Sequence, residues 1–186
     1  MTVYHHRAAK IVGNQILSSW KSEEDWRSYF VGSDAQLCSS DAIHPSPDRS
    51  FRDLKKGTRI LLEFKPYTET KRGILTGLGQ CIAYLNKAHA SILVCPSKVI
   101  DGSGKYFDYG SYLQETFEKF IYGKLPIALF TFDGENLENL TLRRNFDNKL
   151  YDNLKRIKFK DNEPYWAWWR DWPLDAFYKL LKSANN

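Results

Sequence analysis

The sequence has few of the residues that build metal clusters or nucleophile–histidine active sites. Its three cysteines, Cys38, Cys81 and Cys95, lie far apart, and no CxxC or Cys/His cluster occurs. This spacing argues against a structural zinc site. Only four histidines are present, and none sits at a turn after a strand, so no catalytic triad is indicated. The adjacent His5 and His6 are expected to be surface residues near the N-terminus.

Long apolar runs are also absent. No stretch of 18 apolar residues occurs, and the first residues lack the pattern of a signal peptide. Together with the sparse cysteines, this predicts a protein without a membrane segment, in a reducing compartment, which we expect to be the cytoplasm.

The composition is that of an ordinary folded domain with a basic surplus. Of 186 residues, 42% are hydrophobic and 26% charged, and the formal net charge is +5. We expect a single domain over 1–186, with a core at about 20–135 and a basic, aromatic extension at about 136–186. The charge predicts a polyanionic partner such as nucleic acid, although a solvated basic surface would give the same value.

Periodicity and turn signals predict alternating helices and strands. A helix at 22–30 would be capped by Ser22, and a helix at 110–121 by a capping box that begins at Ser111. The helix at 70–88 carries apolar residues at 74, 78, 82 and 85. The strands are expected at 35–44, 59–65, 91–96 and 126–132, and a last helix at 173–183. This order predicts an α/β fold, a central mixed sheet flanked by helices, with a helical, aromatic-rich C-terminal part.

The strand "RILLEFK" (59–65) carries two opposite charges where a buried strand should be apolar. Because alternate residues of a strand share a face, Glu63 and Lys65 point one way while Leu62 and Phe64 point into a core. Such a pair is costly to desolvate. It is either an ion pair at the end of the strand or the floor of a functional site.

Two further features favour a site. Asp41, in "SSDAIH", precedes the pair and could be brought beside Glu63 by a neighbouring strand, which would make a hard oxygen site for Mg²⁺. On the next predicted helix, Gln80 and Tyr84 are one turn apart and share a face that could line the same site.

At this point the chain resembles a known family. The pattern Asp41…Glu63-Phe64-Lys65, followed by "GQCIAY" (79–84) on a helix, is similar to the PD-(D/E)xK nuclease superfamily. That superfamily includes many restriction endonucleases, Holliday-junction resolvases and RecB-like nucleases. The resemblance covers about residues 20–96.

The resemblance implies Mg²⁺-dependent hydrolysis of a phosphodiester bond, with Mn²⁺ able to replace Mg²⁺. Asp41 and Glu63 would bind the metal, and Lys65 would orient the attacking water and stabilise the developing charge. Gln80 would fix a water molecule or a phosphate, and Tyr84 would steady the helix against the site.

The identity of the aspartate has an alternative. Asp48 follows Pro47, and a turn near 55–58 could fold its segment back against 59–65. Asp41 is preferred because the apolar residues after it suit a strand that enters the core, whereas Asp48 is followed by the charged stretch "RSFRDL".

Basic and aromatic residues indicate further contacts with DNA. The segment 142–160 is rich in Lys and Arg and could bind a duplex backbone, although a solvated face is the simpler alternative. The segment 165–172 holds four tryptophans that either stack on bases or pack at the core or a dimer interface. The side chains expected at DNA are Lys71, Arg72, Arg143, Arg144, Lys155 and Arg156.

These features predict a magnesium-dependent endodeoxyribonuclease that acts on double-stranded DNA. A small type II restriction enzyme that works as a homodimer fits best, because a duplex cut needs two sites. The alternatives are a resolvase, a repair nuclease, the nuclease subunit of a larger complex, or an inactive nucleic-acid-binding or subunit-interaction module of the same fold.

Overall fold

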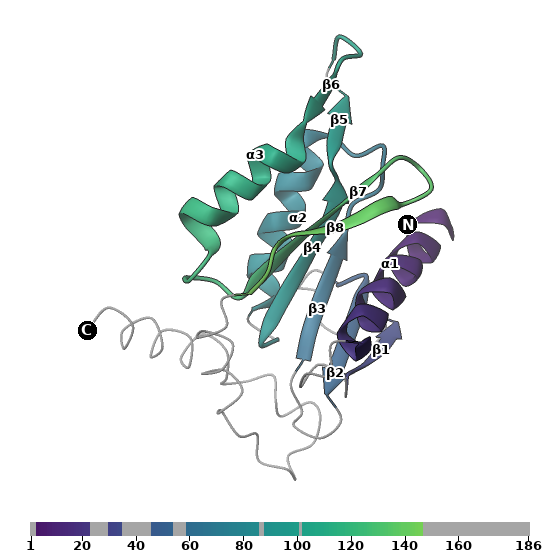
Figure 1. The fold of residues 1–186 in the computed structure, drawn as a ribbon, viewed down its shortest axis with the longest axis vertical. Coiled ribbons are helices and arrows are strands. Elements are labelled where there is room, and N and C mark those ends of the chain that lie inside the picture. The colour runs from purple at the N-terminus through teal and green to yellow at the C-terminus, as the bar shows by residue number, and fades with distance from the viewer. Residues whose placement is uncertain are drawn as a thin grey trace, which may run out of the picture.

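A computed structural model describes residues 3–22, 30–34, 46–53, 59–85, 88–100 and 102–146 of the chain (Figure 1). The helices are α1 (Val3–Ser22), α2 (Lys71–Tyr84), α3 (Tyr109–Thr116) and the π-helical turn η3 (Phe117–Ile121). The strands are β1 (Phe30–Asp34), β2 (Arg49–Asp53), β3 (Arg59–Phe64), β4 (Ala90–Pro96), β5 (Lys98–Ile100), β6 (Tyr106–Asp108), β7 (Ile127–Asp133) and β8 (Glu138–Arg144).

Six of these strands form one mixed sheet in the order β1-β2-β3-β4-β7-β8. The central strands β3, β4 and β7 are parallel, while β1, β2 and β8 are antiparallel to their neighbours. The predicted α/β class with a mixed sheet and flanking helices is therefore confirmed. Strands β5 and β6 form a separate antiparallel hairpin.

The helices cover both faces of the sheet (Figure 1). α1 packs with Ile60, Leu62 and Phe64 of β3 in one core, whereas α2, α3 and η3 pack with alternate residues of β4 and β7 in another. This division follows from strand alternation, as the sequence predicted for 59–65. Parallel strands buried on both faces explain why β3 and β4 consist almost entirely of buried residues.

The first helix differs from the prediction. Val12, Ile16 and Trp20 of α1 are buried at helical spacing, although no helix was predicted before residue 22. Ser22 is the last residue of α1, so its predicted role as an N-cap is wrong, and Phe30 begins a strand. The strand expected at 35–44 lies outside the described residues.

Helix α2 has a side-chain N-cap, and its buried face differs from the one that its apolar spacing predicted. Thr70 is its N-cap, and its side chain accepts a hydrogen bond from the amide of Gly73 at 3.1 Å. The buried residues are Ile74, Gly77, Cys81 and Tyr84, whereas Ile82 is 44% exposed. The buried face shares Ile74 with the expected stripe but is otherwise rotated from it, because Gly77, Cys81 and Tyr84 are buried in place of Leu78, Ile82 and Leu85.

Helix α3 begins earlier than expected, with Asp108 as its N-cap. The Asp108 carboxylate accepts hydrogen bonds from the amide of Ser111 at 3.0 Å and from its hydroxyl at 2.7 Å. The predicted capping box at Ser111 is therefore wrong, because a preceding aspartate satisfies the free amides first.

The packed core extends on both sides of the expected span of 20–135, since α1 contributes to one core and β8 is a strand of the sheet. The Trp-rich segment 165–172 and the predicted helix at 173–183 lie outside the described residues. No helix within the described ranges is long and apolar enough to cross a membrane.

Candidate functional site

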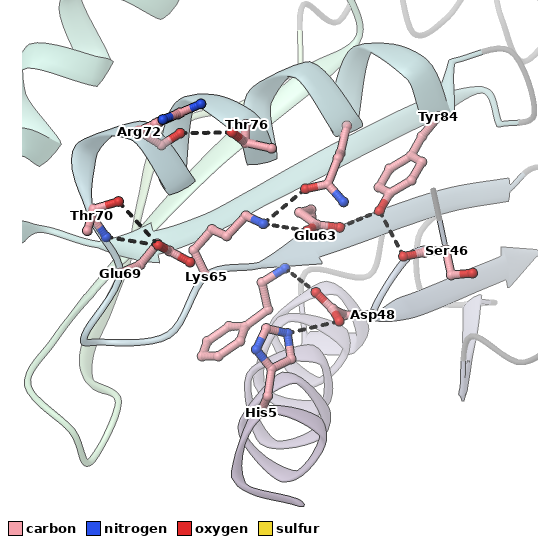
Figure 2. Close-up of polar contacts among 12 residues, drawn as sticks. His5, Ser46, Asp48, Glu63, Lys65, Glu69, Thr70, Arg72, Thr76 and Tyr84 are labelled. Atoms are coloured by element: carbon pink, nitrogen blue, oxygen red, sulfur yellow. Dashed lines mark hydrogen bonds and ion pairs between the residues drawn. The ribbon is translucent and has the colours of Figure 1, made fainter. Parts of the chain in front are cut away.

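The charged pair of β3 lies buried at the centre of a polar cluster (Figure 2). Lys65 Nζ lies 2.9 Å from Glu63 Oε1, and the two side chains are only 12% and 5% exposed. Lys65 Nζ also donates a hydrogen bond to Gln80 Oε1 at 2.9 Å. β3 and the residue after it thus present both charges to α2, and Gln80 of that helix contacts Lys65.

Tyr84 completes this side of the cluster. Its hydroxyl donates to Glu63 Oε2 and lies 3.1 Å from the backbone oxygen of Ser46. Gln80 and Tyr84 are one helical turn apart, so they approach the pair together, as their spacing predicted. Gln80 contacts the lysine while Tyr84 contacts the glutamate.

Gly77 leaves the space that the lysine side chain occupies. A Cβ atom at this position would lie 2.5 Å from Lys65 Cε and 3.1 Å from Leu93 Cδ1. The absence of a side chain at this position of α2 therefore lets Lys65 run between the helix and the sheet to reach Gln80.

The aspartate that the structure brings to this cluster is Asp48. β2 pairs antiparallel with β3, and the backbone amide of Asp48 donates to Leu62 O at 2.9 Å. The Asp48 carboxylate, in a residue only 2% exposed, accepts a hydrogen bond from the amide of Phe64 at 2.8 Å. The segment that contains Asp48 folds back against 59–65, as the alternative assignment of the aspartate to Asp48 required. Asp41 lies outside the described residues.

His5 joins the cluster from α1, which the sequence did not lead us to expect. Its Nε2 lies 3.0 Å from Asp48 Oδ1, and its ring packs edge-on against Phe64 with centroids 5.4 Å apart. The His5 side chain is only 15% exposed, so its predicted surface position is wrong, whereas His6 is exposed. The signal that could have found it is the helical spacing from His5 to the buried Ala8, Ala9 and Val12.

The two carboxylates lie close enough for the charge of Asp48 to perturb Glu63. Burial, and then the nearby charge of Asp48, raise the pKa of Glu63 to about 7, although Lys65 and Tyr84 oppose the shift. Burial, and then the neighbouring Glu63, also raise the pKa of Tyr84 above its ordinary value. The hydroxyl therefore stays protonated and acts as a hydrogen-bond donor.

The donor set fits a magnesium ion better than a transition metal. No group of three or more His, Cys, Asp or Glu side chains converges on one point in the described parts of the chain. Mg²⁺, however, is commonly held by one or two carboxylates and keeps several water ligands. Asp48 and Glu63 supply two such carboxylates, and their mutual repulsion is the condition that a divalent cation would relieve.

The residues that were expected to bind DNA lie in separate parts of the chain and differ in exposure. Lys71 and Arg72 are exposed at the start of α2, a few residues after Lys65 in the chain. By contrast, the Arg143 side chain donates to Thr131 Oγ1 at 2.8 Å, and the Arg144 guanidinium lies 3.8 Å from the ring centroid of Tyr122. Both arginines thus make contacts within the protein. Lys155 and Arg156 lie outside the described residues.

No protein-family model matches this chain, and no curated protein matches its sequence. Its function is therefore inferred from the residues of the site and their geometry.

Proposed function

We propose that the protein is a magnesium-dependent endodeoxyribonuclease of the PD-(D/E)xK type, with Pro47-Asp48 and Glu63-Phe64-Lys65 as its motif. The observation that carries this proposal is that the buried carboxylate of Asp48 accepts a hydrogen bond from the amide of Phe64, the residue between Glu63 and Lys65, whose side chains form a buried ion pair. Two acids and a lysine at one strand end are the groups that hydrolysis of a phosphodiester needs.

The mixed sheet with helices on both faces agrees with the fold that the resemblance implies. The strand arrangement also explains how the residues of the motif come close together. β2 and β3 are antiparallel, which sets Asp48, just before β2, beside the end of β3. α2 then packs against β3 and β4 and adds Gln80 and Tyr84, which contact Lys65 and Glu63. We propose Asp48 rather than Asp41 as the aspartate of the motif because of this placement.

Each side chain has a role that its contacts support. Asp48 and Glu63 would hold Mg²⁺, which when bound acidifies water and neutralises charge on the phosphate. Lys65 is placed to orient the attacking water and to stabilise negative charge in the transition state. Gln80 holds the lysine amine in position. His5 orients Asp48, as outer contacts to metal-binding carboxylates commonly do.

The proposed substrate is double-stranded DNA, and the proposed assembly is a homodimer, as in small type II restriction enzymes. One active site cuts one strand, so a double-strand break by one enzyme molecule needs a second site in the assembly. A resolvase, a repair nuclease or the nuclease subunit of a larger complex would use the same chemistry on a different DNA structure.

The competing function is an inactive nucleic-acid-binding module. It is favoured by the fact that both oxygens of Glu63 already have partners, Lys65 and Tyr84. In that case the pair is only a structural ion pair. The basic surplus of the chain would still give salt-dependent DNA binding.

A plasmid-nicking assay separates these functions. Wild-type protein should convert supercoiled plasmid to nicked or linear DNA with Mg²⁺ or Mn²⁺ and not with EDTA. Glu63→Gln should abolish this conversion, whereas Glu115→Gln should not, because Glu115 lies on the exposed face of α3 in a surface pair with Lys119. Wild-type protein that binds DNA but leaves plasmid intact with either metal would instead support the binding module.

A further inference from the structure

The outer face of α2 is apolar although it is exposed. Between Gly73 and Leu85 the sequence contains no charged residue. The side of α2 that faces the sheet is buried, whereas on the opposite side Leu75 is 46% exposed and Ile82 is 44% exposed. These two residues are seven positions apart, which is about two helical turns, so they lie on one line along the helix. The exposed Gly79 lies between them.

Helix α1, on the other side of the sheet, has the outer face of a solvated helix (Figure 1). Its exposed Ile11 has Arg7 and Asn14 as neighbours on the helix surface. The outer face of α2 has no such charged neighbours, and charged residues are depleted at the centres of protein interfaces. The face of α2 is therefore typical of a protein contact. It does not suit nucleic acid, which needs basic side chains.

The order of residues along this face fits a second copy of the same helix. Across a two-fold axis, a residue of one copy contacts a second residue of the other copy, and the reverse contact also forms. If two α2 helices pack antiparallel with the axis close to Gly79, Leu75 of each copy meets Ile82 of the other. An added Cβ at Gly79 would have nothing within 4 Å, so the two helices can approach closely at the centre of the contact.

The two ends of α2 are complementary in charge in the same arrangement. Positive charge is favourable at the C-terminal end of a helix and unfavourable at the N-terminal end. α2 has Lys71 and Arg72 in its first turn and no basic residue in its last turn. The antiparallel register brings Arg72 of one copy beside Leu85, the C-cap residue, of the other. Each copy thus supplies the charge that its partner's helix end lacks, and Arg72 stays at the edge of the contact, accessible to DNA.

Further apolar surface lies on the same side of the sheet. α3 and η3 pack with α2 in one core, and they leave Tyr112 54% exposed and Phe120 63% exposed. Aromatic side chains are enriched at interfaces. A stable dimer buries about 800 Å² on each partner, which is more than the outer face of one 14-residue helix offers. The neighbouring aromatic side chains provide area that α2 alone does not.

We propose that two copies of this chain pair through the outer face of α2, antiparallel about a two-fold axis near Gly79. The inference rests on the homodimer of the proposed function and names its interface. It also connects the interface with the site, because the inner side of the same helix carries Gln80, which contacts Lys65. The two active sites lie on the far sides of one pair of helices and are held in one particle.

Sedimentation velocity at micromolar concentration tests the interface. Wild-type protein should sediment as a dimer. Leu75→Glu and Ile82→Glu should each raise the dimer dissociation constant by at least about tenfold, because each places an unpaired charge at the centre of the contact. The matched control is Ile11→Glu, which changes an isoleucine of similar exposure, 41%, on α1 and should remain a dimer. A thermal melt of each variant identifies any that has unfolded.

Cysteine cross-linking tests the register without adding charge. Leu75→Cys and Ile82→Cys proteins, mixed and oxidised, should form disulfide-linked dimers with each other, whereas each variant alone should not. In the proposed register the two copies of residue 75 are offset by about 10 Å along the helix axis, and a disulfide spans Cα atoms no more than about 7 Å apart. The native Cys81 and Cys95 are buried, and oxidised wild-type protein measures the background.

The inference is overturned if wild-type protein is a monomer, which would leave the face to a different protein. It is also overturned if Leu75→Glu and Ile82→Glu dimerise like Ile11→Glu, or if the mixed cysteine variants cross-link no more than each alone. Failure of the nuclease proposal is recognised separately, by the plasmid assay with Mg²⁺, in which monomeric variants should still nick. Nicking together with a dimer that persists in both glutamate variants would contradict the α2 interface and leave the nuclease assignment standing.

Discussion

The backbone amide of Phe64 donates a hydrogen bond to the Asp48 carboxylate at 2.8 Å. This single contact joins the two halves of the motif, because Phe64 is the residue between Glu63 and Lys65. It fixes where β2 begins relative to the end of β3. The negative charge of Asp48 is thereby held close enough to raise the pKa of Glu63.

Gly77→Ala should lower cleavage without unfolding the protein. The new methyl group would meet Lys65 Cε and Leu93 Cδ1, and the flexible lysine would move away from Gln80. Because small misplacements of catalytic groups are costly, we expect the cleavage rate to fall by about 10²-fold. Plasmid-nicking kinetics beside a thermal melt would measure both effects.

The matched control is Gly79→Ala in the same helix, where an added Cβ has open space. It should stabilise the protein by roughly 0.5–1 kcal/mol through the helix propensity of alanine and leave cleavage unchanged. Equal cleavage by the two alanine variants would show that the position of Lys65 does not matter.

His5→Ala should weaken both metal binding and cleavage by about 10- to 100-fold, the usual scale when a metal ligand is deprived of its outer hydrogen-bond partner. The substitution removes the partner of Asp48 Oδ1. His6→Ala changes the adjacent exposed histidine and should have no effect. A Mg²⁺ titration of cleavage rate for the three proteins would reveal the difference. Identical titration curves would mean that the His5–Asp48 contact is only structural.

Glu63 should make stability depend on pH when no divalent metal is present. Its pKa is about 7 in the folded protein and 4.5 as the ordinary value, so the folded state holds the proton more tightly than the unfolded state. This contribution to stability is fully present below about pH 4.5 and disappears as the pH rises through 7. The decrease is on the order of 3 kcal/mol.

Urea unfolding of wild-type protein and of Glu63→Gln in EDTA, between about pH 4.5 and 8, would measure this decrease. The stability of wild type relative to Glu63→Gln should fall as the pH rises to about 7 and then level off. Parallel stability curves for the two proteins would contradict the raised pKa.

Lys71 and Arg72 should contribute to DNA binding through charge alone. Replacing both by glutamine should weaken binding to all duplex sequences alike. The slope of log K against log salt should flatten by about 0.9 for each phosphate that these side chains no longer neutralise. The comparison is Arg143→Gln with Arg144→Gln, whose side chains contact Thr131 and Tyr122. An unchanged slope for the first pair would assign Lys71 and Arg72 to a solvated surface.

The sequence predicted which site residues share a face within one strand or helix. It did not predict which separate segments of the chain would meet at the site. Strand alternation placed Glu63 and Lys65 on one face, and helical spacing placed Gln80 with Tyr84. Which aspartate lies beside Glu63 and Lys65 depends on how the charged segment after Asp48 pairs with β3. Sequence favoured the apolar surroundings of Asp41, yet "RSFRD" forms β2 at the sheet position next to β3, with Asp48 just before it.

His5 was missed for a related reason. Its contact with Asp48 joins residues 43 positions apart, and no short motif marks such a contact. The helical register of α1 was visible in its apolar positions, but the face of the sheet that α1 covers is decided by tertiary packing. The β5–β6 hairpin was also missed, because its strands are each only three residues long.

The most direct test of the proposed nuclease site is the cleavage rate of Lys65→Ala beside its affinity for DNA. The variant keeps both proposed metal carboxylates and removes the group that would orient water and balance charge. We predict that Mg²⁺-dependent plasmid cleavage falls by at least about 10²-fold, while the dissociation constant for DNA changes little, because Lys65 is one of 27 Lys and Arg residues. Cleavage by Lys65→Ala at the wild-type rate would contradict this role and reduce Glu63 and Lys65 to a structural ion pair.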